Sequence, residues 1–377
     1  MTKKSKKAGI IITAAGMSKR MKRFKPLLPL GDKCLIDHVI ENAGIDEITQ
    51  TIVIIGYRSI EMKEHLLNVQ KRTGRKITLV ENPAYASTDM FHSIRVGMEA
   101  LDDSLDAFFV IPADMPLVRK SCYKILLNRF ACSERAKVVQ PRHNGHGGHP
   151  ILISMECRDA ILAYTGKEGL RGALCPFADD FLTVKWFDST VLTDADHPED
   201  YDLICRVFRR KKIPGRRECL EILEANHASG SLIAHCLQVE KAAVRIAREA
   251  ARKGYSMDLR LVSAAALLHD VRKGDPAHAA AGAALLRDLG YPEVADIVAE
   301  HMRISEEACS SIDERAVVYL ADKISMGSRE VTLEERFGEK KKLYADNPEA
   351  LENIQRNLER AEALMDALTR PGTGAEA

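Results

Sequence analysis

The chain has 377 residues, and its hydrophobic (46%) and charged (29%) fractions are those of an ordinary globular protein. This length exceeds that of a typical single core, so two domains are expected. Lysine and arginine (55) balance aspartate and glutamate (54), and the net charge of +1 gives no electrostatic argument for a nucleic acid or a membrane as partner.

Cysteine usage and apolar segments indicate the compartment. Nine cysteines are scattered along the chain with no CxxC pair, which is typical of reduced thiols in a cytoplasm. The apolar run at 10–15, after the basic N-terminus, has the length of a strand and is too short for a signal peptide. No stretch approaches the roughly 18 apolar residues of a membrane span. We therefore expect a cytoplasmic protein.

The first half of the chain alternates short Val- and Ile-rich runs with segments of helical period. This alternation predicts an α/β layer fold with a mostly parallel sheet. The expected strands are 9–15, 50–56, 77–81, 107–112, 136–140 and 150–154, and the expected helices are 34–43, 59–70, 93–101 and 122–130.

The second half, from residue 217 onward, carries almost only helical patterns and predicts an all-α domain. One face of 231–252 is apolar, as expected for a buried stripe, and Asp258 is the expected N-cap of a helix that ends at His269. The basic segment 206–217 contains a Pro-Gly break, and a solvated linker is favoured there over a grip for RNA or an acidic partner. The predicted organisation is a domain at 1–208, a basic linker at 209–218, a second domain at 219–365 and a flexible tail at 366–377.

The strand at 9–15 leads directly into the segment AAGMSKRMKRFKPLLPLG. Ala14, Ala15 and Gly16 would let backbone amides approach a polyphosphate. Arg20 and Lys25 would add positive charge where a pyrophosphate leaving group gathers negative charge. The segment is neither a Walker loop nor a GxGxxG loop, and by itself it is more often a surface loop.

Aspartates follow later in the same half. Asp114 comes directly after the strand at 107–112, and open α/β sheets bind ligands at the carboxyl ends of their strands. Asp194 and Asp196 add two carboxylates just before a helix. Carboxylates suit Mg²⁺ that bridges to phosphates, although each aspartate alone would serve equally well as a helix cap or in a turn.

Taken together, these motifs resemble the nucleotidyltransferases of molybdenum cofactor maturation, over about residues 8–206. The string AAGxSxRM, Lys25 with PLLP, Ala-Asp-Met-Pro and Asp-x-Asp-x-Pro-Glu-Asp-Tyr occur in the family's order. AAG and LLP look like the cytidylyltransferase branch, which implies CTP. The segment 82–94, with Ser93, resembles the family's nucleotide loop, and 145–150 its acceptor-side glycine loop. The chain departs from the family at Lys22, where a glycine is usual, and at His92, where paired serines are usual.

The resemblance implies a Rossmann-like domain that joins CTP to a phosphorylated small-molecule acceptor, such as the terminal phosphate of the pterin cofactor. Mg²⁺ held by Asp114, with Asp194 or Asp196, would neutralise charge, and Arg20 and Lys25 would stabilise the departing pyrophosphate. A molybdoenzyme or a maturation factor is the implied protein partner. A sugar-phosphate or alcohol-phosphate acceptor remains an alternative.

The helical half carries an ordered set of histidines and aspartates. Imidazole and carboxylate together suit Fe, Mn, Co or Zn. Neighbouring side chains on a helix diverge by about 100°, so one member of a His-Asp pair can bind a metal while the other bridges to a second. A lone histidine on an apolar helix is mostly a packed or surface residue, but the full set favours a metal centre. Its members are His235, His269, Asp270, His278, His301 and Asp322.

The pattern resembles the HD phosphohydrolase superfamily, over about residues 229–337, through LLHDV, Lys273 and LADKIS. The resemblance implies one metal held by His235, His269, Asp270 and Asp322, and a second held by His278 and His301 together with Asp270. Water activated there would hydrolyse a nucleotide-type phosphoester, with Lys273 stabilising the leaving charge. Arg272 stands where many members have a small residue and is expected to enter the pocket.

The sequence thus predicts a bifunctional enzyme, a nucleotidyltransferase followed by an HD phosphohydrolase. A degenerate HD domain that senses nucleotides and regulates the first domain remains open. The three histidines of RHNGHGGHP, at 143, 146 and 149, are interpreted as part of the glycine loop in preference to a metal tract.

Overall fold

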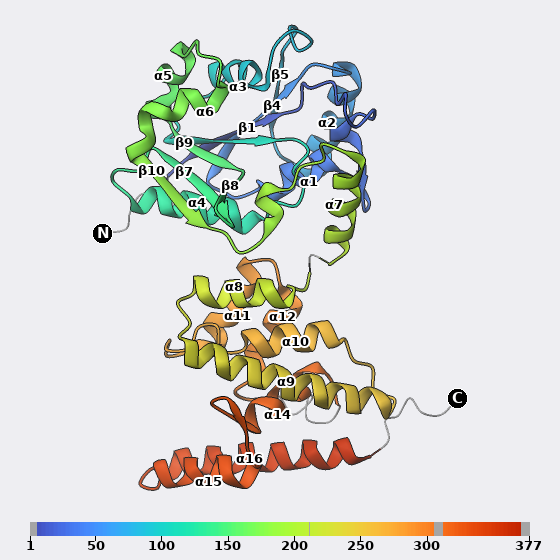
Figure 1. Cartoon of the computed structure of the whole chain (residues 1–377), viewed down its shortest axis with the longest axis vertical. Coiled ribbons are helices and arrows are strands. Elements are labelled where there is room, and N and C mark those ends of the chain that lie inside the picture. The colour runs from blue at the N-terminus through green and yellow to red at the C-terminus, as the bar shows by residue number, and fades with distance from the viewer. Residues whose placement is uncertain (1–5, 211, 305–311, 371–377) are drawn as a thin grey trace. The chain divides into compact units, whose positions relative to one another are not determined.

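The computed structural model of the protein describes residues 6–210, 212–304 and 312–370. The chain forms two compact units, Met1–Arg209 and Arg210–Ala377 (Figure 1). Of the predicted linker, residues 209–210 belong to helix α7 and residues 216–218 to helix α8, and residue 211 lies outside the described residues. Of the predicted tail, residues 366–369 are helical and residues 371–377 lie outside the described residues. No helix in the described ranges is both long and apolar enough to cross a membrane.

An eight-stranded sheet forms the centre of the first unit, in the order β10-β7-β9-β6-β1-β4-β5, with β8 paired to β7. The sheet is mostly parallel, as predicted, and β8 and β9 run against the other strands. The strands are β1 Ala8–Thr13, β4 Ile48–Ile55, β5 Ile77–Glu81, β6 Ala107–Pro112, β7 Val138–His143, β8 His146–Gly147, β9 Ile151–Ser154 and β10 Phe181–Lys185, and β2 Pro29–Leu30 pairs with β3 Lys33–Cys34 in a separate hairpin.

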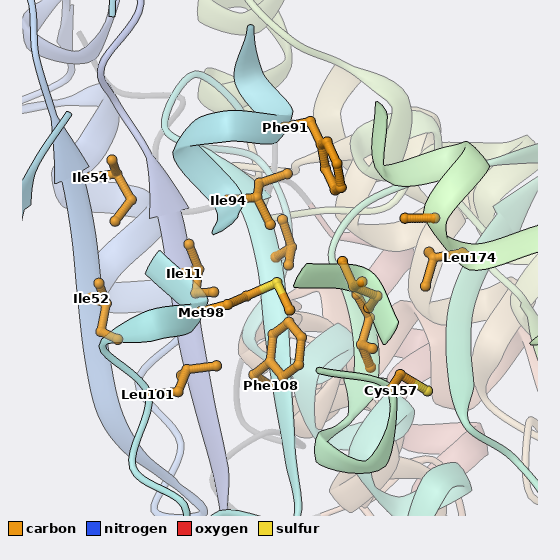
Figure 2. Close-up of a cluster of buried hydrophobic side chains, with 14 of the residues drawn as sticks. Ile11, Ile52, Ile54, Phe91, Ile94, Met98, Leu101, Phe108, Cys157 and Leu174 are labelled. Carbon is orange, nitrogen blue, oxygen red and sulfur yellow. The ribbon is translucent and has the colours of Figure 1, made fainter. Parts of the chain in front are cut away.

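Helices flank this sheet, and apolar side chains fill the space between them. Figure 2 shows part of this core, in which Ile11 of β1 and Phe108 of β6 meet Met98 of α3, and all three are fully buried. The continuous apolar strands bury both faces, which is characteristic of a parallel sheet covered by helices. The helices are α1 Leu35–Asn42, α2 Ser59–Thr73, α3 Met90–Glu99, α4 Lys120–Cys132, α5 Arg158–Ala163, α6 Gly169–Leu174 and α7 Pro198–Arg210, with 3₁₀ turns η1 Lys25–Leu27, η2 Met155–Cys157, η3 Cys175–Asp180 and η4 Ser189–Leu192.

The register of the central strands determines where loops meet. Thr13 at the end of β1 pairs with Pro112 at the end of β6, and the Ala113 amide donates to the Thr13 carbonyl over 3.1 Å. The Ala195 amide in turn donates to the Asp114 carbonyl over 3.2 Å. The turn after β1, the Asp114 turn and the segment before α7 therefore converge at one edge of the sheet.

The described part of the second unit is helical, as predicted, apart from a short hairpin of two antiparallel strands of two residues each. Asp258 caps α10, and its side chain accepts from the amides of Arg260 and Leu261. The predicted stripe on α9 is buried from Cys236 to Ala250, and α9 packs against α10 and α14. The elements are α8 Arg216–Ala225, α9 Gly230–Arg252, α10 Leu259–Leu268, α11 His278–Asp288, α12 Pro292–Glu300, α14 Glu314–Lys323, β11 Ser325–Met326, β12 Arg329–Glu330, α15 Leu333–Leu343 and α16 Pro348–Thr369.

Candidate active sites

A cavity of about 490 Å³ lies at the carboxyl ends of β1 and β6 in the first unit. Open α/β sheets bind ligands at this edge, because the loops that leave parallel strands meet there. The structure brings together in its wall all the residues that the sequence singled out for nucleotide or magnesium binding: Ala14, Ala15, Gly16, Arg20, Lys25, Ser93, Asp114, Asp194 and Asp196.

Ion pairs join the charged members of this wall. Lys25 Nζ lies 3.1 Å from Asp114 Oδ2 and 2.5 Å from Asp196 Oδ1, and Arg20 Nη2 lies 2.7 Å from Asp196 Oδ2. Burial disfavours the charged form of Lys25, but the two carboxylates outweigh it and raise the pKa of the ammonium. Lys25 and Arg20, which we expected at a pyrophosphate, are turned towards the aspartates in this structure.

Lys25 compensates the third carboxylate of the wall, Asp194, only in part. Burial, and then the charges of Asp114 and Asp196, raise the pKa of Asp194. A further cation at this edge would stabilise all three carboxylates, and hard oxygen donors are the ligands that Mg²⁺ prefers. These residues therefore fit a magnesium ion.

The loop after β1 keeps an unusual backbone at the position where the resembled family has glycine. Lys22 has a φ of 53° and Ser18 a φ of 51°, both in the left-handed region, and the Lys22 amide donates to the Ser18 carbonyl over 3.1 Å. The Ser18 hydroxyl accepts from the Lys25 amide over 3.1 Å. The chain thus retains the left-handed conformation that glycine favours although the residue is lysine.

The segment before α3 is organised from within. Asn82 Nδ2 donates to the hydroxyls of Thr88 (3.2 Å) and Ser93 (3.1 Å), and Asp89 caps α3 by accepting from the His92 amide. Ser93 lines the cavity, while His92 is not among the described lining residues of this cavity or of its neighbour. The departure from paired serines at His92 therefore leaves the cavity wall unaltered.

A second cavity, of about 820 Å³, adjoins the first and shares lining residues with it, among them Thr13, Gly147 and His149. Gly148 packs too closely for any side chain, because a Cβ there would lie 2.5 Å from the Val191 carbonyl oxygen. Residues of the predicted acceptor-side glycine loop therefore line both cavities.

The three histidines of that loop do not form a metal-binding group among the described residues. His143 contacts the Trp186 carbonyl, His146 that of Asn144 and His149 that of Val110. Each of these rings thus has a backbone contact, and the interpretation of the segment as a glycine loop stays a prediction.

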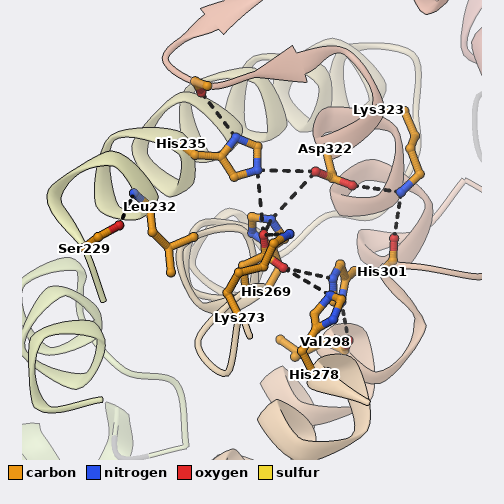
Figure 3. A network of polar contacts seen from close by, with 12 residues as sticks. Ser229, Leu232, His235, His269, Lys273, His278, Val298, His301, Asp322 and Lys323 are labelled. Carbon is orange, nitrogen blue, oxygen red and sulfur yellow. Dashed lines mark hydrogen bonds and ion pairs between the residues drawn. The ribbon is translucent and has the colours of Figure 1, made fainter. Parts of the chain in front are cut away.

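The second unit contains two groups of potential metal ligands that share Asp270. Figure 3 shows His235, His269, His278 and His301 around this place, with Asp322 beside them. In the first group, His235 Nε2 lies 3.5 Å from Asp322 Oδ1 and 3.9 Å from Asp270 Oδ2. His269 Nε2 lies 3.4 Å from Asp270 Oδ2 and 3.8 Å from Asp322 Oδ1. The donor atoms of His235, His269 and Asp270 lie within 4.8 Å of one another, and Asp322 Oδ1 adjoins the two histidines.

The second group uses the other oxygen of the same carboxylate. His278 Nε2, at the start of α11, lies 3.3 Å from Asp270 Oδ1, and His301 Nε2, after α12, lies 3.5 Å from it. Asp270 Oδ2 faces the first group and Oδ1 the second, which is the arrangement of a carboxylate that bridges two cations.

Several of these donor atoms are buried without a hydrogen-bond partner, namely Asp270 Oδ1 and the Nε2 atoms of His269, His278 and His301. An unsatisfied buried polar atom is costly, and such atoms around one point indicate a missing partner. Nδ1 of His269 and of His301 contacts the Ala266 and Val298 carbonyl respectively, which orients Nε2 inward.

The ionisable groups of the cluster respond to burial and to one another. Burial opposes the charged form of His269, but its contacts with Asp270 and Asp322 outweigh this and raise the pKa of the imidazole, as expected where carboxylates face it directly. Burial lowers the pKa of His278 and of His301, which favours the neutral ring that binds metals. At Asp270, burial opposes ionisation, but contacts with His269, His301 and Lys273 outweigh it and hold the pKa far below its usual range. The six residues predicted from the sequence therefore fit a centre for two transition-metal ions.

Charged residues next to this cluster differ in where they point. Lys273 Nζ lies 2.8 Å from Asp270 Oδ2, so this lysine adjoins the ligand cluster. Arg272 was expected to enter the pocket, and this is wrong. Its guanidinium pairs with Asp275 over 2.9 Å and its side chain is 42% exposed, since residues 271–273 form a turn after α10 in which Arg272 and Lys273 have different partners.

Two groups were missed at the level of sequence. Cys34, Asp37 and His65 place ligand atoms within 4.8 Å of one another. Asp37 is already satisfied there, since it accepts from the Cys34 amide and lies 2.6 Å from His65 Nε2. The other group consists of basic side chains of α15, among them Arg336, which lies beside Asp322. The i, i+4 spacing of basic residues along this helix was the signal that the sequence offered.

Both units are similar to known protein families. Residues 10–178 match the family described as MobA-like NTP transferase domain, and residues 232–327 match the HD domain family. The molybdenum cofactor cytidylyltransferase of Escherichia coli (strain K12) is 29% identical over 191 residues, covering 51% of this chain and 92% of that protein. The bifunctional protein GlmU of Cyanothece sp. is 31% identical over 136 residues, covering 36% of this chain and 28% of that protein.

Among solved structures, a nucleotidyl transferase from Methanothermobacter thermautotroptrophicus has 22% sequence identity and a TM-score of 0.44. The match covers 54% of this chain and 99% of that one.

Proposed function

Since residues 10–178 form a MobA-like NTP transferase domain and residues 232–327 an HD domain, we propose that this chain is a bifunctional enzyme of molybdenum cofactor maturation. Its first unit would transfer the cytidylyl group of CTP to the terminal phosphate of the pterin cofactor. Its second unit would hydrolyse a nucleotide-type phosphoester. The likeness to the cytidylyltransferase of Escherichia coli over 92% of that protein carries the first part of the proposal.

For the transfer, an oxygen of the acceptor phosphate would attack the α-phosphorus of CTP in line. A new P–O bond forms, the bond to the bridging oxygen of the β-phosphate breaks, and pyrophosphate leaves. The two connected cavities support a reaction between two bound substrates, since they meet at Thr13, Gly147 and His149. No protein nucleophile is needed.

The residues of the first cavity would act through charge. Asp114, with Asp194 or Asp196, would hold Mg²⁺, which supplies positive charge to the phosphates when bound. Lys25 and Arg20 now pair with Asp114 and Asp196, and a cation at these carboxylates would release them towards the pyrophosphate. Amides of the turn after β1 would bind phosphate oxygens.

For the hydrolysis, the division of Asp270 between two ligand groups is the observation that carries the proposal. His235, His269, Asp270 and Asp322 would hold one metal ion, and Asp270, His278 and His301 the other. Bound metals supply Lewis acidity and lower the pKa of water. Lys273 would stabilise negative charge on the leaving group.

The test uses the full-length protein. CTP, GTP and UTP are each supplied with the pterin phosphate, a sugar phosphate or an alcohol phosphate, and pyrophosphate release is measured. We expect release from CTP with the pterin acceptor, and preference for another acceptor would contradict the molybdenum cofactor assignment. In parallel, metal content and hydrolysis of a nucleotide panel are measured. Protein that takes up no transition metal would contradict the hydrolase assignment.

A further inference from the structure

Helix α15 follows the part of the chain that matches the HD family and brings further positive charge to the histidine–aspartate cluster. Arg336 Nη2 lies 4.0 Å from Asp322 Oδ1, and the Arg336 side chain is 19% exposed. Its Nε is buried and has no hydrogen-bond partner. Lys340, one turn later, lies on the same side of the helix. Arg336 thus presents a free donor beside a residue expected to bind metal.

Two lysines already form ion pairs with the carboxylates of the cluster. Lys273 Nζ lies 2.8 Å from Asp270 Oδ2, and Lys323 Nζ lies 2.8 Å from Asp322 Oδ2 and donates to the His301 carbonyl. Lys323 is buried, and its ammonium group contacts both Asp322 and the His301 carbonyl, so it holds Asp322 in position. Arg336 and Lys340 come in addition to these pairs.

The surroundings of Lys340 are strongly cationic. Burial, followed by the charges of Lys323 and Arg336, lowers the pKa of Lys340 to about 8. Metal ions in the cluster would add to this positive charge. Cations that outnumber neighbouring carboxylates at a partly buried place repel one another, and a bound anion would relieve this repulsion.

We propose that Arg336 and Lys340 form an anion subsite beside the cluster that binds a doubly charged terminal phosphate. This deepens the proposed hydrolase function and rests on it: the HD centre would take a phosphomonoester or a nucleoside polyphosphate in preference to a phosphodiester. A diester phosphate carries one charge and two free oxygens. A terminal phosphate carries two charges and three free oxygens, enough to contact metal ions held by the cluster and the guanidinium of Arg336 at the same time.

The first measurement needs neither metal nor activity. Inorganic phosphate is titrated calorimetrically into the chelator-treated full-length protein, with Arg336→Gln, Lys340→Gln and the control Lys342→Gln. Lys342 is an exposed lysine of the same helix. We expect affinity to fall about tenfold in each of the first two variants, as for loss of a charged hydrogen bond, and to stay unchanged in the control. The nucleotide cavity of the first unit is identical in all variants, so it does not contribute to the difference.

The second measurement compares p-nitrophenyl phosphate with bis(p-nitrophenyl) phosphate in the metal-loaded protein. We expect kcat/KM to fall about tenfold for the monoester in both variants and to change little for the diester, with partial recovery in Arg336→Lys. Equal losses on both substrates, or phosphate affinity unchanged in Arg336→Gln and Lys340→Gln, would overturn the subsite. If the wild type hydrolyses neither substrate but the variants still lose phosphate affinity, the subsite stands and the hydrolase function fails.

Discussion

Both candidate sites pair carboxylates with cationic side chains, but they differ in how many buried polar atoms are left without a hydrogen-bond partner. In the first unit, Asp114 and Asp196 are paired with Lys25, and Asp196 also with Arg20. In the second unit, Asp270 Oδ1 and three histidine nitrogens are buried without a hydrogen-bond partner. Ion pairs offset the cost of burying charged groups when no metal is bound. Buried metal-ligand atoms that have no partner instead lower the stability of the folded unit until a cation binds to them.

The backbone of the two sites differs as well. The first site is built from loops that leave strand ends, and its path depends on left-handed residues such as Lys22. The second places its ligands on or next to helix ends, where packing of α9, α10 and α14 determines their spacing. We therefore expect metal to organise the second site more than the first, and four experiments examine this difference.

Replacing Asp270 with Asn should have the largest effect. Both ligand groups use this carboxylate, so loss of its charge should remove both metals and lower hydrolysis by roughly 10³-fold, given several kcal/mol of metal-derived stabilisation. Metal content and nucleotide hydrolysis provide the measurement. Asp275→Asn, which alters only a surface ion pair with Arg272, is the matched control. Retention of both metals in the Asp270 variant would refute the bridging role.

Replacing Asp114 with Ala should lower the rate of pyrophosphate release from CTP by roughly 10³-fold, a loss comparable to that expected for hydrolysis in Asp270→Asn, because the carboxylate is proposed to hold Mg²⁺. Hydrolysis by the second unit should be unchanged, and the Asp270 variant should retain nucleotidyl transfer. Full transfer activity in Asp114→Ala would show that this edge of the sheet is not the reaction site.

Removing metal with a chelator should destabilise the second unit and spare the first. At a metal concentration of about 100 times Kd, binding contributes about 2.7 kcal/mol. For a unit of this size we expect Tm to fall by roughly 5–10 °C. Calorimetry of the full-length protein, with the Asp270→Asn variant as the reference that no longer responds to chelator, measures the shift. A shift in the transition of the first unit instead would reverse the comparison.

Replacing Lys22 with Gly should have the smallest effect, a stabilisation of the first unit by about 0.5–1 kcal/mol. Glycine relieves the cost of the left-handed backbone and gives part of this back through its freedom in the unfolded chain. Denaturant unfolding measures the change. The exposed Lys19 does not have positive φ, so Lys19→Gly should give no stabilisation. If both variants behave alike, the loop is not organised by this residue.

Much of the fold could be predicted from local pattern. The strands at 77–81 and 107–112 and the helix capped by Asp258 lie where periodicity and capping residues placed them, because these signals act within a few neighbouring positions. The edge strand β10, which is only partly buried, gave no such signal and was missed.

The sequence by itself determined the kinds of ligands and their order, since the resemblance and the donor chemistry depend only on residue type and spacing. Tertiary structure decided the rest. Only the folded chain shows that the two oxygens of Asp270 face different histidine groups and that Arg336 reaches Asp322 while Arg272 points away. The register of the sheet likewise decides that Lys25 lies between aspartates 89 and 171 positions away. The direction of a side chain and its long-range partners depend on how elements pack, and local pattern carries no information about this.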